Sequence, residues 1–406
     1  SGKGVVGGFR HGRLRNALVV FEVAMSLILL TGAGLLMRTF TALQTVDLGL
    51  NPDNILVARL PLPRGQYDRA EQKDRFFQTL LHRLSALPGV VAATETSTLP
   101  PYGGIQSEIE IPGKSHGETW TAIYQLCSEG YFPTLGLRII QGRPLSAVEV
   151  ADARKTAVVN LTLARKYFGK ENPLGQHIRV KQLETGRDPV PNAIFEIVGI
   201  IADAKNSGLQ DPPRPELFVP YTITGAFERG ILVRTAQDPH LLLNTVRKEI
   251  WAVDSRVALT LTGSLNDYIS QFTYAEPRFS LLLLGVFAGV GLVLVAIGVY
   301  SVIAYTVSRQ SHEIGIRMAL GAKSGDVLKM VLWMSLRLLG VGIVIGIAAS
   351  LAGARVLANQ LWGVSPHDPV TLVAVVALVT LVGLTACYFP ARRATRVDPM
   401  VALRYE

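Results

Sequence analysis

The feature that most constrains the fold is a run of 29 residues, 279–307, that contains no charged residue. At 1.5 Å rise per residue, a helix of about 20 apolar residues crosses the hydrocarbon of a bilayer. Three further apolar runs, at 16–37, 331–356 and 369–389, also reach that length. Because backbone polar groups in hydrocarbon must bond within their own segment, these runs predict four membrane-spanning helices.

The order of the spans divides the chain into one helix, a large domain and three helices. Only 17% of the residues are charged, against about a quarter in soluble domains. Residues 1–15 form an N-terminal tail, and 38–278 have ordinary globular composition. Residues 279–389 hold the last three spans with a loop at 308–330, and 390–406 form the C-terminal tail.

Lysine and arginine are concentrated on one side of the predicted membrane helices. The two tails and the loop 308–330 carry four each, whereas the loop 358–368 carries none. Because cytoplasmic loops are enriched in these residues, we expect the tails and the basic loop in the cytoplasm and 38–278 outside it. Residues 38–278 hold 26 basic and 25 acidic residues, so the net charge of +9 comes mainly from the tails and the loop on the cytoplasmic side. A nucleic-acid partner would need a basic folded surface, and none is predicted.

The basic loop contains a short segment with helical spacing. Glu313 and Arg317 are four residues apart, a spacing at which opposite charges stabilise a helical turn. Ile316 and Leu320 share a face, and Gly321 can end the helix. Such a helix can lie on the headgroups through its apolar side, or it can bind a partner protein. The pattern alone leaves both interpretations open.

This segment and other regions resemble the FtsX/MacB family of ABC transporter permeases. The sequence at 313–322 is similar to the family's cytoplasmic coupling segment, and those at 388–394 and 398–406 are similar to its C-terminal tail. Four further segments resemble the extracytoplasmic domain of the family: 130–137, 142–144, 158–160 and 172–175. The resemblance implies that an ATPase docks on Glu313, Ile314, Gly315, Ile316, Arg317, Met318, Ala319, Leu320, Gly321 and Ala322.

The resemblance implies a permease subunit of a MacB/FtsX-type ABC transporter in the bacterial cytoplasmic (inner) membrane. It would couple ATP hydrolysis by a separate ATPase to conformational work of the extracytoplasmic domain, exporting a drug, peptide or lipid-linked cargo. A second permease half or copy, membrane lipid and a periplasmic adaptor are the other partners considered. The chain begins at Ser1 and resembles the second half of a duplicated permease. The alternative is a non-transporting scaffold that regulates an envelope enzyme such as a cell-wall hydrolase.

The segment 38–278 is predicted to be an α/β domain. A strand–helix–strand order occurs twice, at 55–60, 70–87 and 90–94, and again at 231–235, 239–253 and 257–261. Two βαβ halves side by side give a ferredoxin-like layer. Between them, residues 105–222 form an inserted subdomain richer in strands, of which 195–201 is the clearest. The resemblance implies the same two-part build.

No catalytic or metal site is predicted. A P-loop requires Gly-x-x-x-x-Gly-Lys-Ser/Thr, and Gly113-Lys114-Ser115 supplies only its end, because Glu108 stands where the first glycine belongs. The seven histidines are scattered, and the cysteines at 127 and 387 lie in different segments and should not pair. We therefore expect no enzyme activity, no cofactor and no metal in this chain, with the ATPase on a separate polypeptide.

Glycines at Gly-x-x-x-Gly spacing occur in two of the spans. Gly285 and Gly289 lie in the second span, and Gly342 and Gly346 lie in the third. This spacing lets helix backbones approach closely. Packing among the chain's own helices and pairing with a second permease half both fit it.

Two of the three charged residues inside the predicted spans lie at similar depth. Glu22 and Arg337 each lie about six residues from the cytoplasmic end of a predicted span, which is roughly 10 Å along a helix. A lone charge in hydrocarbon is costly, so we predict that they form an intramembrane charge pair. The alternative is that Arg337 reaches the headgroups while Glu22 is protonated or faces a wet crevice.

Overall fold

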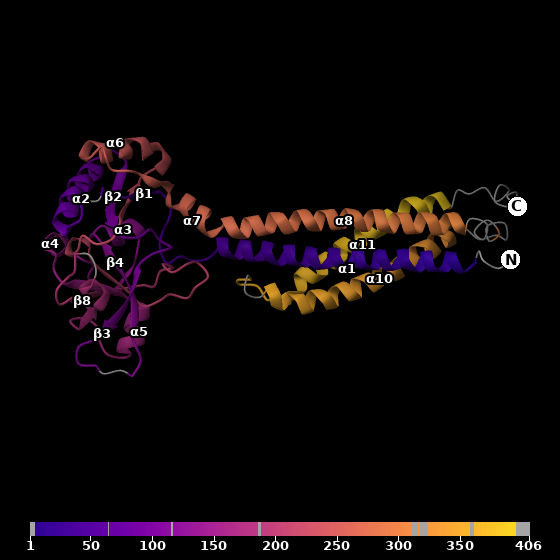
Figure 1. The fold of residues 1–406 in the computed structure, drawn as a ribbon, viewed down its shortest axis with the longest axis horizontal. Helices are drawn as coiled ribbons and strands as arrows, with labels where there is room; N and C mark the ends of the chain where they lie inside the picture. Colours follow the sequence, from indigo (N-terminus) through magenta and orange to yellow (C-terminus); the bar gives the residue numbers. More distant parts are fainter. Residues whose placement is uncertain are drawn as a thin grey trace. The chain divides into compact units, whose positions relative to one another are not determined.

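A computed structural model describes residues 5–63, 65–114, 117–185, 188–310, 316, 324–357 and 361–394. The chain divides into two compact units (Figure 1). One is helical and comprises Ser1–Thr45 and Glu276–Glu406; the other is an α/β unit, Val46–Ala275.

The helical unit contains four long helices that are apolar enough to cross a membrane. They are α1 (Val5–Gln44), α8 (Ala275–Arg309), α10 (Ser324–Leu357) and α11 (Pro369–Ala394). The stretches long and apolar enough to span are Leu14–Gln44, Pro277–Arg309, Gly325–Gly353 and Pro369–Arg392. The predicted arrangement of one helix before the domain and three after it is confirmed.

An apolar core joins the four helices. Its buried members are Val19, Val23 and Leu27 of α1, Val295, Val299, Val302 and Ile303 of α8, Val331 and Leu339 of α10, and Val375, Val379, Cys387 and Ala391 of α11. At the extracytoplasmic end, Asp368 caps α11 by accepting hydrogen bonds from the Thr371 amide at 2.8 Å and hydroxyl at 2.6 Å. Arg38 of α1 also binds the Asp368 carboxylate, at 2.5 Å, and so connects α1 to the start of α11.

The first part of the α/β unit is a four-stranded antiparallel sheet. Its order is β11 (Thr260–Ser264), β1 (Ile55–Leu60), β10 (Arg229–Thr235) and β2 (Val90–Thr96). Helix α2 (Ala70–Ser85) links β1 to β2, and α6 (Leu243–Val253) follows β10. Each helix connection therefore spans a strand that lies between the two it joins, as in a ferredoxin-like fold. The predicted layer is confirmed.

The second βαβ half differs from the prediction in its details. The helix expected at 239–253 begins as a 3₁₀ turn, Pro239–Leu242, and the strand expected at 257–261 is β11, three residues later. The apolar Val257 is buried in the turn after α6. Its amide donates to the Asp254 carbonyl at 3.2 Å. The sequence pattern predicts a strand at 257 because Val257 is apolar, but this residue is buried in a turn and pairs with no strand.

The inserted subdomain forms a closed circuit of strands. The order β4-β3-β7-β8-β6-β9 returns to its start, because β9 pairs in parallel with β4. The strands are β3 (Ile105–Glu110), β4 (Thr121–Cys127), β5 (Ile139–Gly142), β6 (Thr156–Asn160), β7 (His177–Val180), β8 (Ile194–Ile201) and β9 (Glu216–Pro220). The short helices are α3 (Tyr131–Leu135), α4 (Ala147–Ala151) and α5 (Leu161–Phe168), with 3₁₀ turns at Lys181–Glu184 and Tyr221–Ile223.

A buried ion pair connects the two parts of the α/β unit. Arg229, at the start of β10, binds Glu95 of β2 at 2.9 Å, and neither side chain is exposed. The guanidinium also donates to the carbonyls of Tyr221 at 3.2 Å and Thr224 at 2.7 Å, in the segment that returns from β9. Removing either charge would leave the other buried without compensation, which is strongly destabilising.

Several of the sequence motifs shape the backbone of this unit. Gly136 ends α3 in the left-handed region, with φ of +67°, where glycine is favoured. The Asn160 side chain caps α5 by accepting from the Leu163 amide at 2.9 Å, and it also accepts from the Glu216 amide at 2.9 Å. Gly136 and Asn160 thus have structural roles, at the end of α3 and at the start of α5.

The buried carboxyl of Glu216 makes a pH dependence testable. Burial raises its pKa to about 8, and its partner is the Asn206 amide group, which donates at 2.9 Å. Because this folded-state pKa lies above the ordinary value of 4.5, the folded state binds more protons between pH 4.5 and 8. Stability should therefore fall as pH rises through that window. We expect Glu216→Gln to weaken the dependence of the thermal unfolding midpoint on pH without removing it, because burial also raises the pKa of Glu95 to about 8.

The matched control is Glu196→Gln, at an exposed position of β8. This variant should keep the slope of the unchanged protein. If Glu216→Gln kept that slope as well, Glu216 would be ionised in the folded state throughout the range.

Candidate functional site

The predicted coupling segment, 313–322, lies outside the described residues except for Ile316, which is exposed. The structure does describe the helices that lead into and out of it, α8 and α10. On this cytoplasmic side, the Tyr305 ring of α8 receives two guanidinium groups. Arg15 of α1 lies 3.9 Å and Arg309 of α8 lies 6.0 Å from the ring centroid. Cation–π contacts thus hold Arg15 and Arg309 on Tyr305, near the cytoplasmic end of α8 that leads into the coupling segment.

Gly342 and Gly346 place α10 directly against α1. A Cβ at Gly342 would stand 2.7 Å from the Cβ of Val23, and one at Gly346 would stand 3.0 Å from the Cβ of Leu27. The backbone of Ala24 lies almost as close, with its Cα 3.1 Å from the position of a Cβ at Gly346. This motif serves packing within the chain, which is one of the two uses that the sequence left open.

Gly285 and Gly289 show the opposite environment. No described atom comes within 4 Å of a Cβ built at either position. Helix α8 instead turns Gly291 and Gly298 towards α1, where they meet Ser26 and Glu22. The span in α8 is also the least buried of the four. The face with Gly285 and Gly289 is therefore free of contacts with the described part of this chain.

The structure does not bring Glu22 and Arg337 together as an ion pair. Oε2 of Glu22 is buried against Gly298 of α8 and has no hydrogen-bond partner among the described residues. The Arg337 guanidinium lies over the Trp333 ring of its own helix, 5.4 Å from the centroid. The two residues sit at comparable depth, but Glu22 faces α8 while Arg337 stacks on its own helix. The predicted charge pair is therefore not formed among the described residues.

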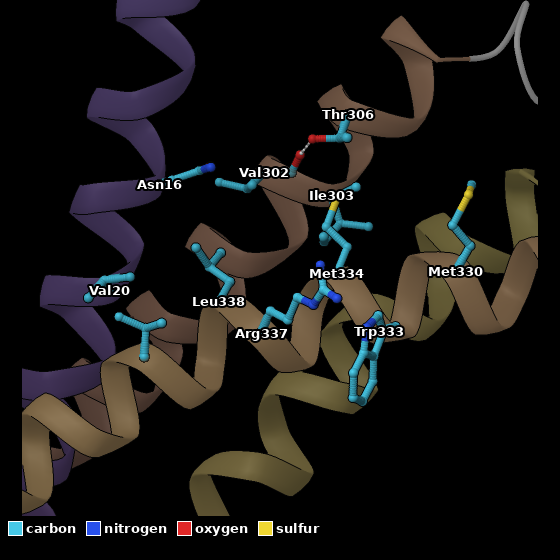
Figure 2. Close-up of a pocket in the computed structure, with 11 residues that line it drawn as sticks. Asn16, Val20, Val302, Ile303, Thr306, Met330, Trp333, Met334, Arg337 and Leu338 are labelled. Atoms are coloured by element: carbon cyan, nitrogen blue, oxygen red, sulfur yellow. Dashed lines mark hydrogen bonds between the residues drawn. The ribbon is translucent and has the colours of Figure 1, made fainter.

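The helical unit also contains a pocket that the sequence did not indicate. It lies between α1, α8 and α10 and has a volume of about 450 Å³ (Figure 2). The residues that line it are Asn16, Val20, Val302, Ile303, Thr306, Met330, Trp333, Met334, Arg337, Leu338 and Val341. The one sequence feature that points to this pocket is the four-residue spacing of Trp333 and Arg337, which places both side chains on one face of a helix.

Comparisons with known proteins agree with the fold and the helical unit. Residues 17–250 match the family described as MacB-like periplasmic core domain, which is more than half of the chain. Residues 285–399 match the family described as FtsX-like permease C-terminal.

Individual relatives extend this similarity along most of the chain. The macrolide export ATP-binding/permease protein MacB of Bartonella quintana (strain Toulouse) is 28% identical over 342 residues, 80% of this chain and 46% of that protein. The pyoverdine export ATP-binding/permease protein PvdT of Pseudomonas syringae pv. tomato (strain ATCC BAA-871 / DC3000) is 28% identical over 329 residues, 77% of this chain and 46% of that protein. The chain thus spans just under half the length of these relatives.

Among solved structures, the periplasmic region of MacB from Actinobacillus actinomycetemcomitans aligns with 55% of this chain and 93% of that chain. Its identity to this chain is 17% and the TM-score is 0.38.

The two glycine pairs allow a matched test of helix packing. Gly346→Leu should destabilise the helical unit by about 1–3 kcal/mol, because the added side chain meets the backbone of α1. Gly289→Leu should leave the stability of the monomer within about 0.5 kcal/mol of the unchanged protein, as expected for open positions. Unfolding of both variants in detergent micelles provides the measurement. Equal losses in the two variants would contradict the α1–α10 packing.

The charge pair can be examined by a double-mutant cycle. Because Glu22 and Arg337 contact different neighbours, Glu22→Gln and Arg337→Gln should add to within about 0.5 kcal/mol in the double variant. Unfolding free energies of the two single variants and the double variant in the same micelle give the interaction energy. A coupling well above 1 kcal/mol would show that the two side chains meet in the membrane.

Proposed function

Since the chain belongs to the FtsX/MacB family of ABC transporter permeases, we propose that it forms the permease part of an export system whose ATPase docks on 313–322. The observation that carries this proposal is the match of both family regions in one chain, 17–250 and 285–399. ATP binding and hydrolysis would move the docking segment together with α8 and α10, the helices on either side of it.

A short connection links α8 to the extracytoplasmic unit. Helix α7 (Leu265–Thr273) belongs to that unit, and Tyr274 alone separates it from the start of α8. Three residues of α7, Leu265, Tyr268 and Ile269, are buried, and the Thr273 hydroxyl bonds the Tyr102 hydroxyl at 2.6 Å. A displacement of α8 would thus reach a helix that is fixed within the α/β unit.

The connection after α1 is also bonded into the α/β unit. The Leu48 carbonyl accepts from the Lys205 amide and the Asn51 amide donates to the Leu135 carbonyl, each at 2.8 Å. The Arg234 guanidinium donates to the carbonyl of Asn51 at 2.9 Å. Both connections to the helices are therefore held by defined contacts, which supports transmission of movement to the extracytoplasmic unit.

The open face of α8 supports the proposal of a second permease copy. Gly285 and Gly289 lie on that helix without neighbours in the described chain, at a spacing that favours close helix packing. A second copy would complete the contacts that this chain leaves open.

The cargo is proposed from the relatives alone. Two of them are named for export of macrolides and of pyoverdine. A drug, peptide or lipid-linked molecule taken up on the extracytoplasmic side is the corresponding proposal for this chain.

Arg317→Glu tests the docking segment. With the ATPase that copurifies with the chain, we expect the variant to insert and fold normally but to lose export, because a reversed charge opposes docking. The purified chain alone should hydrolyse no ATP, because its sequence has no phosphate-binding loop. Export of a fluorescent substrate and phosphate release, measured in the same proteoliposomes, distinguish loss of coupling from loss of hydrolysis.

The matched control is Lys329→Glu, a charge reversal at an exposed position of α10 outside the segment. It should retain export. Full coupled export by Arg317→Glu would mean that 313–322 is only a membrane-surface helix. Hydrolysis by the purified chain alone would overturn the assignment of the ATPase to another polypeptide.

A further inference from the structure

The pocket between α1, α8 and α10 lies in the cytoplasmic half of the membrane. Its residues lie near the cytoplasmic end of two spans, at 16 and 20 in α1 and 302–306 in α8, and between the first turns and the middle of the third, at 330–341 in α10. In a multi-pass inner-membrane protein with this orientation, the space beside the pocket is occupied by the inner leaflet. The pocket opens laterally, since Trp333 is 58% exposed and Val341 is 53% exposed.

The lining is apolar except for a few groups. Thr306 uses its hydroxyl to donate to the Val302 carbonyl of its own helix at 2.8 Å, so that hydroxyl is already bonded. Asn16 and Arg337 are the other polar side chains of the lining. Figure 2 shows Asn16 on α1, across the pocket from α10, which carries Arg337 and Trp333.

Arg337 gives this apolar pocket a positive charge. Its guanidinium stacks on Trp333, and no ion pair with a carboxylate is present for it in the described part of the chain. Arginine binds phosphate through parallel hydrogen bonds while its flat face stacks on an aromatic ring. Trp333 lies one helical turn nearer the cytoplasmic end of α10 than Arg337, and the long arginine side chain can extend from within the span towards the lipid headgroups.

We propose that this pocket binds an anionic phospholipid of the inner leaflet. The phosphate is held by Arg337, and an acyl chain lies against Val20, Ile303 and Leu338. A free phosphate ion would leave the apolar lining unfilled, and a neutral lipid would leave the guanidinium without a net countercharge. Arg15 and Arg309, held on Tyr305, add positive charge on the cytoplasmic side of the same helices. This site does not depend on which cargo or ATPase the chain serves.

Trp333 provides a direct probe of the site. The full chain is placed in phosphatidylcholine nanodiscs, and lipids with brominated acyl chains are added as phosphatidylglycerol or as phosphatidylcholine. Bromine quenches tryptophan at contact, and the signal of Trp333 is the difference between the unchanged protein and Trp333→Phe. We expect phosphatidylglycerol to be preferred by about fivefold at Trp333, because one basic side chain near a membrane surface contributes about that factor.

Variants separate the lipid site from general contact with the bilayer. Arg337→Gln should remove the preference for phosphatidylglycerol, whereas Lys329→Gln, which removes a charge from α10 outside the pocket, should keep it. Val20→Phe narrows the pocket from α1 and should reduce quenching by both lipids. A preference that survives Arg337→Gln, quenching that Val20→Phe leaves unchanged, or displacement of the lipid by inorganic phosphate would each overturn the proposal.

Discussion

The close approach of α1 and α10 is the contact on which the helical unit depends. Between two helices in hydrocarbon there is no hydrophobic driving force, so association rests on backbone proximity and shape. Gly342 and Gly346 supply that proximity by admitting Val23 and Leu27 of α1. Since α1 precedes the α/β unit and α10 follows it, this contact, with the Arg38–Asp368 ion pair, joins segments that the chain itself keeps far apart. Both connections to the α/β unit then start from one helical body.

The α/β unit is stabilised in a different way, by strand pairing and a buried ion pair. Six of the seven strands of the inserted subdomain pair in a circle, so each of the six has neighbours on both sides over part of its length, and β5 pairs with β8 outside the circle. The bond between Arg229 and Glu95, together with the carbonyls of Tyr221 and Thr224, connects that circle to the ferredoxin-like layer. Cys127, the one cysteine in the sequence of this unit, is free and buried, so the unit depends on its core and hydrogen bonds.

The spans and the ferredoxin-like layer could be predicted because their signals are local. A charge-free run such as 279–307 has few alternatives to a membrane helix, and the strand Ile55–Leu60 is found where its apolar pattern places it. No local sequence pattern reveals how a membrane helix is rotated about its own axis. Gly289 and Gly346 belong to the same motif, yet one faces open space and the other faces α1. For the same reason, the sequence indicates the depth of Glu22 and Arg337 in the membrane but not which residues they contact. It also does not reveal the pocket between α1, α8 and α10. Pairing of β4 with β9 joins positions almost a hundred residues apart, which no local pattern reveals.

The contact between α1 and α10 also sets a delay during biosynthesis. From the end of α1 at Gln44 to the start of α10 at Ser324 the ribosome must add 280 residues (324 − 44). At 5–20 residues per second this takes about 15 to 60 s. Throughout that time Val23 and Leu27 of α1 lack the contact with Gly342 and Gly346, because α10 has not yet been made. Helix α1 must therefore be a stable membrane anchor by itself before the glycine face of α10 exists.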